Sequence, residues 1–265
     1  MKIYSLVIAM ILGTCMVSNA QNSKGEEIRV ALSNPGSHGV LEASSHRGSM
    51  TVTAYDGNEV IVTLYADDDD KGKNKSKNGL KKISGGTVNA EISEGDNVVQ
   101  IQTGSQNTVD VSVQVPRDFD VILSTHHNGD VYVKGIDGTS EINAHHGDVT
   151  LESVGSSANV NTHHGEIKAT FRSVDSKLPM VLTTYHGDVD ISLPPGANFN
   201  TKLKTTKGDI YTDYEIDMKT SVNKVESTGK GTKVEIGGWR HGVVGSGGQE
   251  YMLSSYHGDI IIRKN

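Results

Sequence analysis

The chain has 265 residues, of which 35% are hydrophobic, 5% aromatic and 22% charged, a composition that suits one large or two small globular domains and excludes a membrane-embedded protein. The 25 Lys and Arg residues against 32 Asp and Glu residues give a net charge of −7, so the charge balance does not favour nucleic acid or an anionic membrane as a partner. Thirty glycines with only five prolines indicate turn-rich β structure.

The N-terminus has the pattern of a secretory signal peptide over residues 1–20. Lys2 precedes an apolar run from Leu6 to Leu12, which is too short to span a bilayer, and Ser18-Asn19-Ala20 resembles a cleavage site. We therefore expect an exported chain in the periplasm, on the outer-membrane surface or secreted, without a transmembrane span. A lipoprotein acylated at Cys15 is a less favoured alternative, because the residue before it is bulky for that processing.

The remaining residues, 21–265, are expected to form one domain with two surface features. Four acids and then four lysines follow one another from Asp67 to Asn78, which predicts a charged surface loop over 67–82. Residues 218–248 include a Gly-rich stretch around Trp239 and predict either an insertion or an extra structural repeat.

A short pattern centred on Gly organises the chain. Between Gly129 and Gly208 the glycines follow one another at steps of 18, 18, 22 and 21 residues. Apolar and polar residues alternate on both sides of each copy, as in Val131-Tyr132-Val133, so each copy reads as strand, turn, strand. The copies are Thr125–Asp130, Ala144–Asp148, Thr162–Glu166, Thr184–Asp188, Thr205–Asp209 and Ser255–Asp259, with a degenerate earlier copy at Ser45–Ser49.

A unit of about 20 residues with two or three short strands cannot bury its own apolar face, so such units must stack on one another. The pattern therefore predicts an all-β fold, a single-stranded β-helix (β-solenoid) with coils of roughly 18–22 residues, expected to be right-handed. Adjacent coils would lie about 4.8 Å apart, and identical positions in successive coils would form columns.

The sequence resembles the bacterial putative-adhesin domain family of β-strand repeats, a cell-envelope family. The resemblance rests on Val115–Val121 before the repeats, on the repeated Gly-Asp-Val/Ile units, on Leu193–Gly196 and on the closing Gly258–Arg263, and it covers roughly residues 85–265. It implies a β-helix outside the cytoplasm with an adhesive or structural role. This chain carries His or Lys where the family usually has Asn before the corner Gly.

Nine of the eleven histidines lie in the corners and form two columns in the sequence pattern. Directly before Gly stand Arg47, Asn128, His146, His164, His186, Lys207 and His257, and one position earlier stand His46, His127, His145, His163, Tyr185, Thr206 and Tyr256. We expect the first column to adopt a positive φ, which His tolerates better than most residues. The second should point to solvent and stack, since the Thr or Ala before it points inward.

Metal binding is the alternative interpretation of the same columns. Imidazoles on adjacent coils could contribute to a zinc, copper or nickel site, with the Asp or Glu after each Gly as a further ligand. The candidate ligands are His127, His145, His146, His163, His164 and His186. A flat ladder does not by itself form a tetrahedral cage, so structural stacking is favoured and no cofactor is predicted.

The sequence does not favour catalysis. A uniform column of carboxylates offers no pair with distinct environments for acid–base work, and few aromatic residues besides Trp239 could form a sugar platform. We expect a non-catalytic, exported, adhesin-like solenoid that binds an envelope or extracellular protein or glycan, and no nucleic acid. The alternatives are a metal-binding envelope protein and, second, a β-helix that binds or cleaves polysaccharide.

Overall fold

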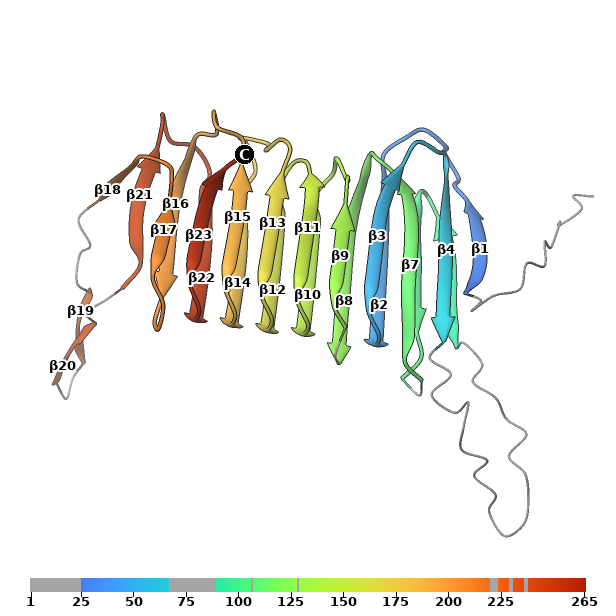
Figure 1. Ribbon diagram of the computed structural model, residues 1–265, viewed down its shortest axis with the longest axis horizontal. Coiled ribbons are helices and arrows are strands. Elements are labelled where there is room, and N and C mark those ends of the chain that lie inside the picture. Colours follow the sequence, from blue (N-terminus) through green and yellow to red (C-terminus); the bar gives the residue numbers. More distant parts are fainter. Residues whose placement is uncertain are drawn as a thin grey trace, which may run out of the picture.

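The computed structural model describes residues 25–66, 89–105, 107–127, 129–219, 224–228, 231–235 and 238–265. Within these ranges the chain forms strands and turns, and no helix is present that could cross a membrane (Figure 1). The prediction of an all-β fold is confirmed. The predicted signal peptide at 1–20, the lipoprotein site at Cys15 and the charged loop at 67–82 lie outside the described residues.

Two large sheets, here called sheet A and sheet B, contain nearly all the strands. In order across sheet A lie β1 (Glu26–Ala31), β4 (Glu59–Ala66), β7 (Val109–Pro116), β3 (Met50–Tyr55), β9 (Val131–Lys134), β11 (Val149–Val154), β13 (Ile167–Phe171), β15 (Val189–Leu193), β23 (Ile260–Lys264) and β17 (Ile210–Thr212). In order across sheet B lie β18 (Ile216–Lys219), β21 (Arg240–Val244), β16 (Phe199–Thr205), β22 (Glu250–His257), β14 (Met180–His186), β12 (Ala158–His164), β10 (Ser140–His146), β8 (Phe119–His127), β2 (Gly39–Arg47), β6 (Val98–Thr103) and β5 (Ala90–Gly95). A separate antiparallel pair is formed by β19 (Lys224–Thr228) and β20 (Gly231–Glu235).

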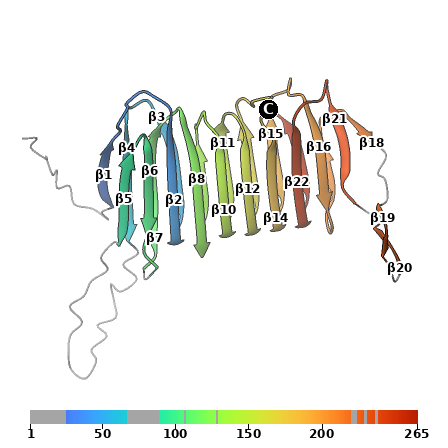
Figure 2. The same ribbon diagram turned by 180° about the vertical axis from the view of Figure 1, so that it is seen from behind.

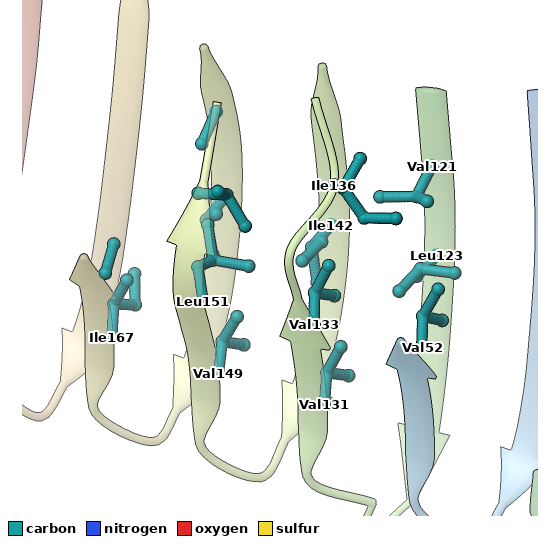
Figure 3. Close-up of a cluster of buried hydrophobic side chains, with 14 of the residues drawn as sticks. Val52, Val121, Leu123, Val131, Val133, Ile136, Ile142, Val149, Leu151 and Ile167 are labelled. Atoms are coloured by element: carbon teal, nitrogen blue, oxygen red, sulfur yellow. The ribbon is translucent and has the colours of Figure 1, made fainter. Parts of the chain in front are cut away.

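Each coil of the repeat region consists of one strand in sheet B, a Gly corner and one strand in sheet A. Neighbouring coils pair in parallel and in register, so that Ile142 lies opposite Val160 and Val149 lies opposite Ile167. The period-two alternation turns every second side chain inward, and these aliphatic residues fill the space between the sheets (Figure 3). The solenoid prediction is confirmed, and the predicted right-handedness stays a prediction.

The order of coils in the stack differs from their order in the chain at both ends. The coil β2–β3 lies between β6–β7 and β8–β9. The C-terminal coil β22–β23 lies between β14–β15 and β16–β17 (Figures 1 and 2). The last residues of the chain therefore fill a place inside the stack.

Antiparallel strands cover both ends of the stack. At one end β1 pairs with β4 and β5 pairs with β6, and at the other β21 pairs with β16 and β18. Within residues 218–248 the described strand β21 runs antiparallel to β16, and the choice between an insertion and an extra coil stays a prediction. Trp239 directly precedes β21 and so lies near that end of sheet B.

Candidate binding face and histidine ladders

The corner glycines lie in one line along the stack, as predicted. At each corner, a Cβ added to the glycine would overlap the backbone carbonyl of the residue at the same corner of the neighbouring coil. At Gly147, where φ is +131°, that carbonyl belongs to Gly129. Glycine is required there by close approach as well as by conformation. The line runs in the order Gly48, Gly129, Gly147, Gly165, Gly187, Gly258 and Gly208.

Buried hydroxyl groups support these tight corners from inside. The Thr at the start of each corner was predicted to point inward, and it is buried in two coils, with exposed fractions of 2% for Thr162 and 3% for Thr184. Thr184 Oγ1 donates to the carbonyl of Gly165 at 3.0 Å, and Ser255 Oγ donates in the same way to Gly187 at 2.9 Å. Each bond gives a donor to the carbonyl of a half-buried corner glycine.

The carboxylates after the glycines bond to the backbone of the neighbouring coil. Asp130 Oδ1 accepts from the N–H of Asp148 at 2.9 Å, and Asp148 Oδ1 accepts from the N–H of Glu166 at 2.8 Å. Asp188 does the same for Asp259 at 2.7 Å. This column therefore runs along the stack and stabilises the corners, which matches a structural role for it.

The corner rings form two ladders on the outer surface beside these glycines. In the middle of each ladder the rings are nearly parallel, with centroids 5.3 Å apart for His145 and His163 and 4.9 Å apart for His146 and His164. At one end of the outer ladder the rings of His46 and His126 are tilted by 37°. The outer ladder consists of His46, His126, His145, His163, Tyr185 and Tyr256. The corner ladder consists of Arg47, His127, His146, His164, His186 and His257.

The predicted position of His127 is wrong by one column. Thr125 lies opposite Ala144, so His126 is level with His145, and His127 is level with His146 in the corner ladder. The prediction assigned columns by distance from the glycine. In this coil Asn128 is an extra residue between the strand and Gly129, so the assignment is shifted by one position.

The explanation offered for the histidines before Gly is also wrong. Among the non-glycine residues that the structure describes, a positive φ occurs at Asp96, Asn97, Ser153 and Ser156, and at no corner histidine. The corner histidines instead continue the extended strand, and the glycine after them makes the turn. Their stacking therefore follows from the in-register pairing of parallel strands.

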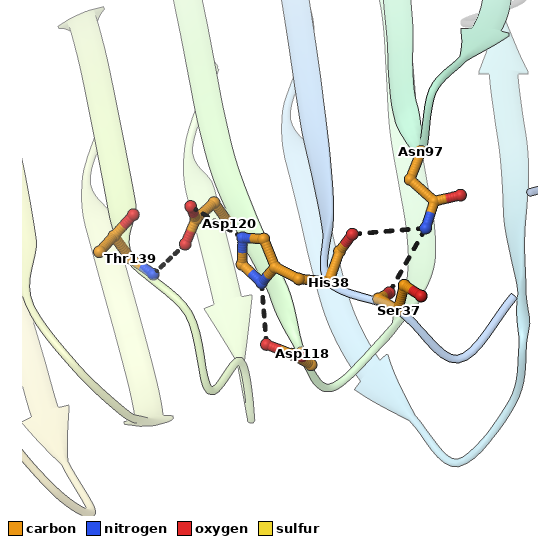
Figure 4. A network of polar contacts seen from close by, with 6 residues as sticks. All are labelled: Ser37, His38, Asn97, Asp118, Asp120 and Thr139. Atoms are coloured by element: carbon orange, nitrogen blue, oxygen red, sulfur yellow. Dashed lines mark hydrogen bonds and ion pairs between the residues drawn. The ribbon is translucent and has the colours of Figure 1, made fainter. Parts of the chain in front are cut away.

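Two environments set the histidine pKa values apart. Partial desolvation in the stack, followed by the charges of the neighbouring imidazoles, lowers the pKa of His145 and His164 from the ordinary value. His38 lies away from the ladders, and its hydrogen bond to Asp118 at 2.9 Å, with a second contact to Asp120, raises its pKa (Figure 4).

The six proposed metal ligands all lie in the ladders, but the arrangement suits a metal ion poorly. Zinc needs ligand nitrogens that converge at about 2.0–2.1 Å around one point. Parallel rings such as His164 and His186, with centroids 4.8 Å apart, do not converge in this way. In the part of the chain that the structure describes, no group of three or more His, Cys, Asp or Glu side chains could hold an ion.

A groove of about 610 Å³ runs along sheet B beside the outer ladder. Small polar residues form its floor, the outer ladder forms a wall, and Trp239 closes one end, where Lys202 Nζ lies 5.1 Å from the centroid of the indole ring. The floor residues are Ser124, Asn143, Asn161, Thr183 and Ser254. This row was not among the residues predicted from the sequence, although each member stands two positions before a ladder residue and must share its face.

Comparison with curated proteins found no match. Comparison with solved structures matched two chains. One, described as "a putative cell adhesion protein from Clostridium sporogenes ATCC 15579", is 10% identical with a TM-score of 0.48, and the alignment covers 91% of this chain and 100% of the other. The second, described as "a putative adhesin" from Bacteroides fragilis NCTC 9343, is 10% identical with a TM-score of 0.41 and coverage of 92% and 98%.

The family comparison covers nearly the whole sequence. The model of the family described as Toastrack DUF4097 matches residues 19–263, which extends the predicted resemblance through the N-terminal coil. The chain therefore belongs to the Toastrack DUF4097 family.

Proposed function

We propose that this protein is an exported, non-catalytic, adhesin-like binding protein whose ligand is an extended glycan lying in the groove of sheet B. The groove carries this proposal, because it extends over strands of six neighbouring coils and so suits a linear ligand. Amide and hydroxyl groups of its floor, such as Asn143 and Thr183, can bond sugar hydroxyl groups. The signal pattern at 1–20 supports export.

The carboxylate column supports a binding role over a catalytic one. Glycoside cleavage needs two carboxyl groups in different environments beside the scissile bond. Here Asp130, Asp148 and Asp188 share one environment and accept backbone hydrogen bonds at the corner. The floor row itself has no carboxylate: its members are neutral except for Lys204, which lies level with Ser254.

Binding of soluble polysaccharides tests this proposal. A panel that includes dextran and polygalacturonate would be titrated calorimetrically at pH 7.5 and pH 5.0. Asn161→Trp should fill the groove and weaken binding at least tenfold, whereas Lys168→Trp, on the exposed face of sheet A, should leave binding unchanged. The proposal is wrong if no polysaccharide binds at either pH, or if Asn161→Trp binds like the parent.

A thermal shift measurement separates this proposal from the metal-binding alternative. Zinc at pH 7.5 should leave the melting temperature unchanged, because the ladder rings do not converge on one point. A zinc-dependent rise that disappears in His145→Thr/His163→Thr would favour the metal-binding protein instead.

A further inference from the structure

The two ladders bring nine imidazoles to one edge of the molecule. No imidazole of this edge forms an ion pair with a carboxylate among the residues that the structure describes. The nearest acidic column, which includes Asp130 and Asp148, bonds to backbone N–H groups along the stack. These carboxylates keep their negative charge in those bonds, so each ring that gains a proton makes the edge more positive beside a fixed acidic column.

We propose that the imidazole ladders form a proton-gated binding site for a linear anionic glycan that carries carboxylate groups along its length. This inference rests on the proposed function, because the glycan would follow the same groove, which His126, His145 and His163 line. It adds the chemical class of the ligand and the condition under which it binds.

Permanent cations stand at both ends of the corner ladder. At one end Arg47 lies opposite His127 on the neighbouring strand. At the other end Lys207 follows His257, and the backbone N–H of Lys207 donates to the carbonyl of Tyr256. Between them the corner rings from His146 to His257 stack with centroids 4.7–4.9 Å apart. Protonation converts this row into a continuous line of cations, which matches a polymer with regularly spaced carboxylates.

The other charged groups on sheet B do not cancel this line. Glu42 and Glu141 lie on the side of the groove away from the ladders, each four residues before a residue of the outer ladder on the same strand. Lys202 lies on the same side and forms an ion pair with Glu250. Lys204 lies at the Trp239 end of the groove. Exposed charges farther apart than about 8 Å are largely screened at physiological ionic strength, so distant acids act only weakly on the ladders. The acids that act on them are those of the corner column, such as Asp148, which stands two positions after His146.

The charge of the edge changes within a narrow pH range. The lowered pKa of His145 and His164 favours their neutral form at pH 7.5. At pH 5.0 imidazoles gain protons, whereas glycan carboxyl groups, with pKa values of about 4, remain ionised. Binding of the anion further favours the protonated rings, since linkage couples the two events.

Binding of fluorescent polygalacturonate, measured by polarisation at pH 5.0 and 7.5 and equal ionic strength, tests the inference. We expect binding at least tenfold tighter at pH 5.0. His164→Asn/His186→Asn should lose most of that gain. His164→Lys/His186→Lys, which uses the residue found at position 207, should bind at pH 7.5 as well. His38→Asn, which changes a histidine outside the ladders, should behave like the parent.

Three results would overturn the inference. They are equal affinity at both pH values, an unchanged pH response in His164→Asn/His186→Asn, or tighter binding of single-stranded DNA than of polygalacturonate at pH 5.0. If polygalacturonate binds equally at both pH values while dextran binding is lost in Asn161→Trp, the acid-gated site is wrong and the proposed function stays intact.

Discussion

The corner glycines are the residues at which a single methyl group should matter most. Gly147→Ala would place a Cβ against the carbonyl of Gly129 and hold alanine at a φ of +131°, which costs on the order of 1–3 kcal/mol for the conformation alone. Gly196→Ala is the matched control, because no atom lies within 4 Å of an added Cβ there. Thermal melts should show a large loss for Gly147→Ala and a small change for Gly196→Ala. Equal melting temperatures would contradict the crowded corner.

Two buried threonines give opposite predictions for the same substitution. Thr184→Val removes the hydroxyl proton that the carbonyls of Gly165 and His186 share and should lower the free energy of unfolding by about 1 kcal/mol. Thr201 is equally buried, but its Oγ1 has no partner among the described residues, so Thr201→Val should be neutral or stabilising. Chemical denaturation of both variants checks this. Destabilisation of both to the same extent would show that the hydroxyl bonds at the corner contribute nothing.

The residue-scale predictions succeeded where alternation decided them. Thr162 and Thr184 face inward, and His145 and His163 face outward, because side chains of a strand alternate strictly between its two faces. The prediction for His127 was wrong because strand pairing, not the distance from the glycine, sets the register. One extra residue before Gly129 shifts any assignment that is counted from the glycine.

At the scale of the elements, the sequence specifies each coil but not its neighbours. Every coil offers the same pattern of inward aliphatic residues, so β22 could pair equally well with β14 or with β16, and in the structure it pairs with both. The connection decides the order: the residues between β17 and β22 include β18 and β21, which pair with each other and extend sheet B beyond β16. A pattern repeated in all coils carries no information about that choice.

The inserted C-terminal coil makes a testable prediction about truncation. Deleting residues 250–265 removes β22 and β23, leaves β14 and β16 without a shared partner and removes Tyr251, which stacks on Phe199 at 4.6 Å. We expect a large fall in melting temperature or the loss of cooperative unfolding. Replacing residues 224–235 by a Gly-Ser linker is the control, since β19 and β20 pair only with each other, and it should change little. A truncated chain that melts within a few degrees of the full chain would argue against the insertion.

At the scale of the whole molecule, the ladders make stability depend on pH. The folded pKa of His145 and His164 is lowered by desolvation in the stack and by neighbouring imidazoles, so the unfolded chain binds more protons once the pH falls through about 6.5. The free energy of unfolding therefore decreases on acidification. His38 has the opposite sign: the hydrogen bond to Asp118 raises its pKa, so its contribution is present below about pH 6.5 and is lost as the pH rises through its folded pKa.

The melting temperature should accordingly fall between pH 7.5 and pH 5.0, and more steeply at low salt, because screening weakens the repulsion between protonated rings. His145→Tyr/His163→Tyr keeps a flat ring in the outer ladder, as Tyr185 does when it stacks on His163 at 5.1 Å, but tyrosine does not titrate in this range. That variant should melt like the parent at pH 7.5 and lose less on acidification. His38→Asn should lose more on acidification, because it lacks the group that gains stability there. A parent protein whose stability is constant over this range would mean that the stacked imidazoles protonate as easily as free ones.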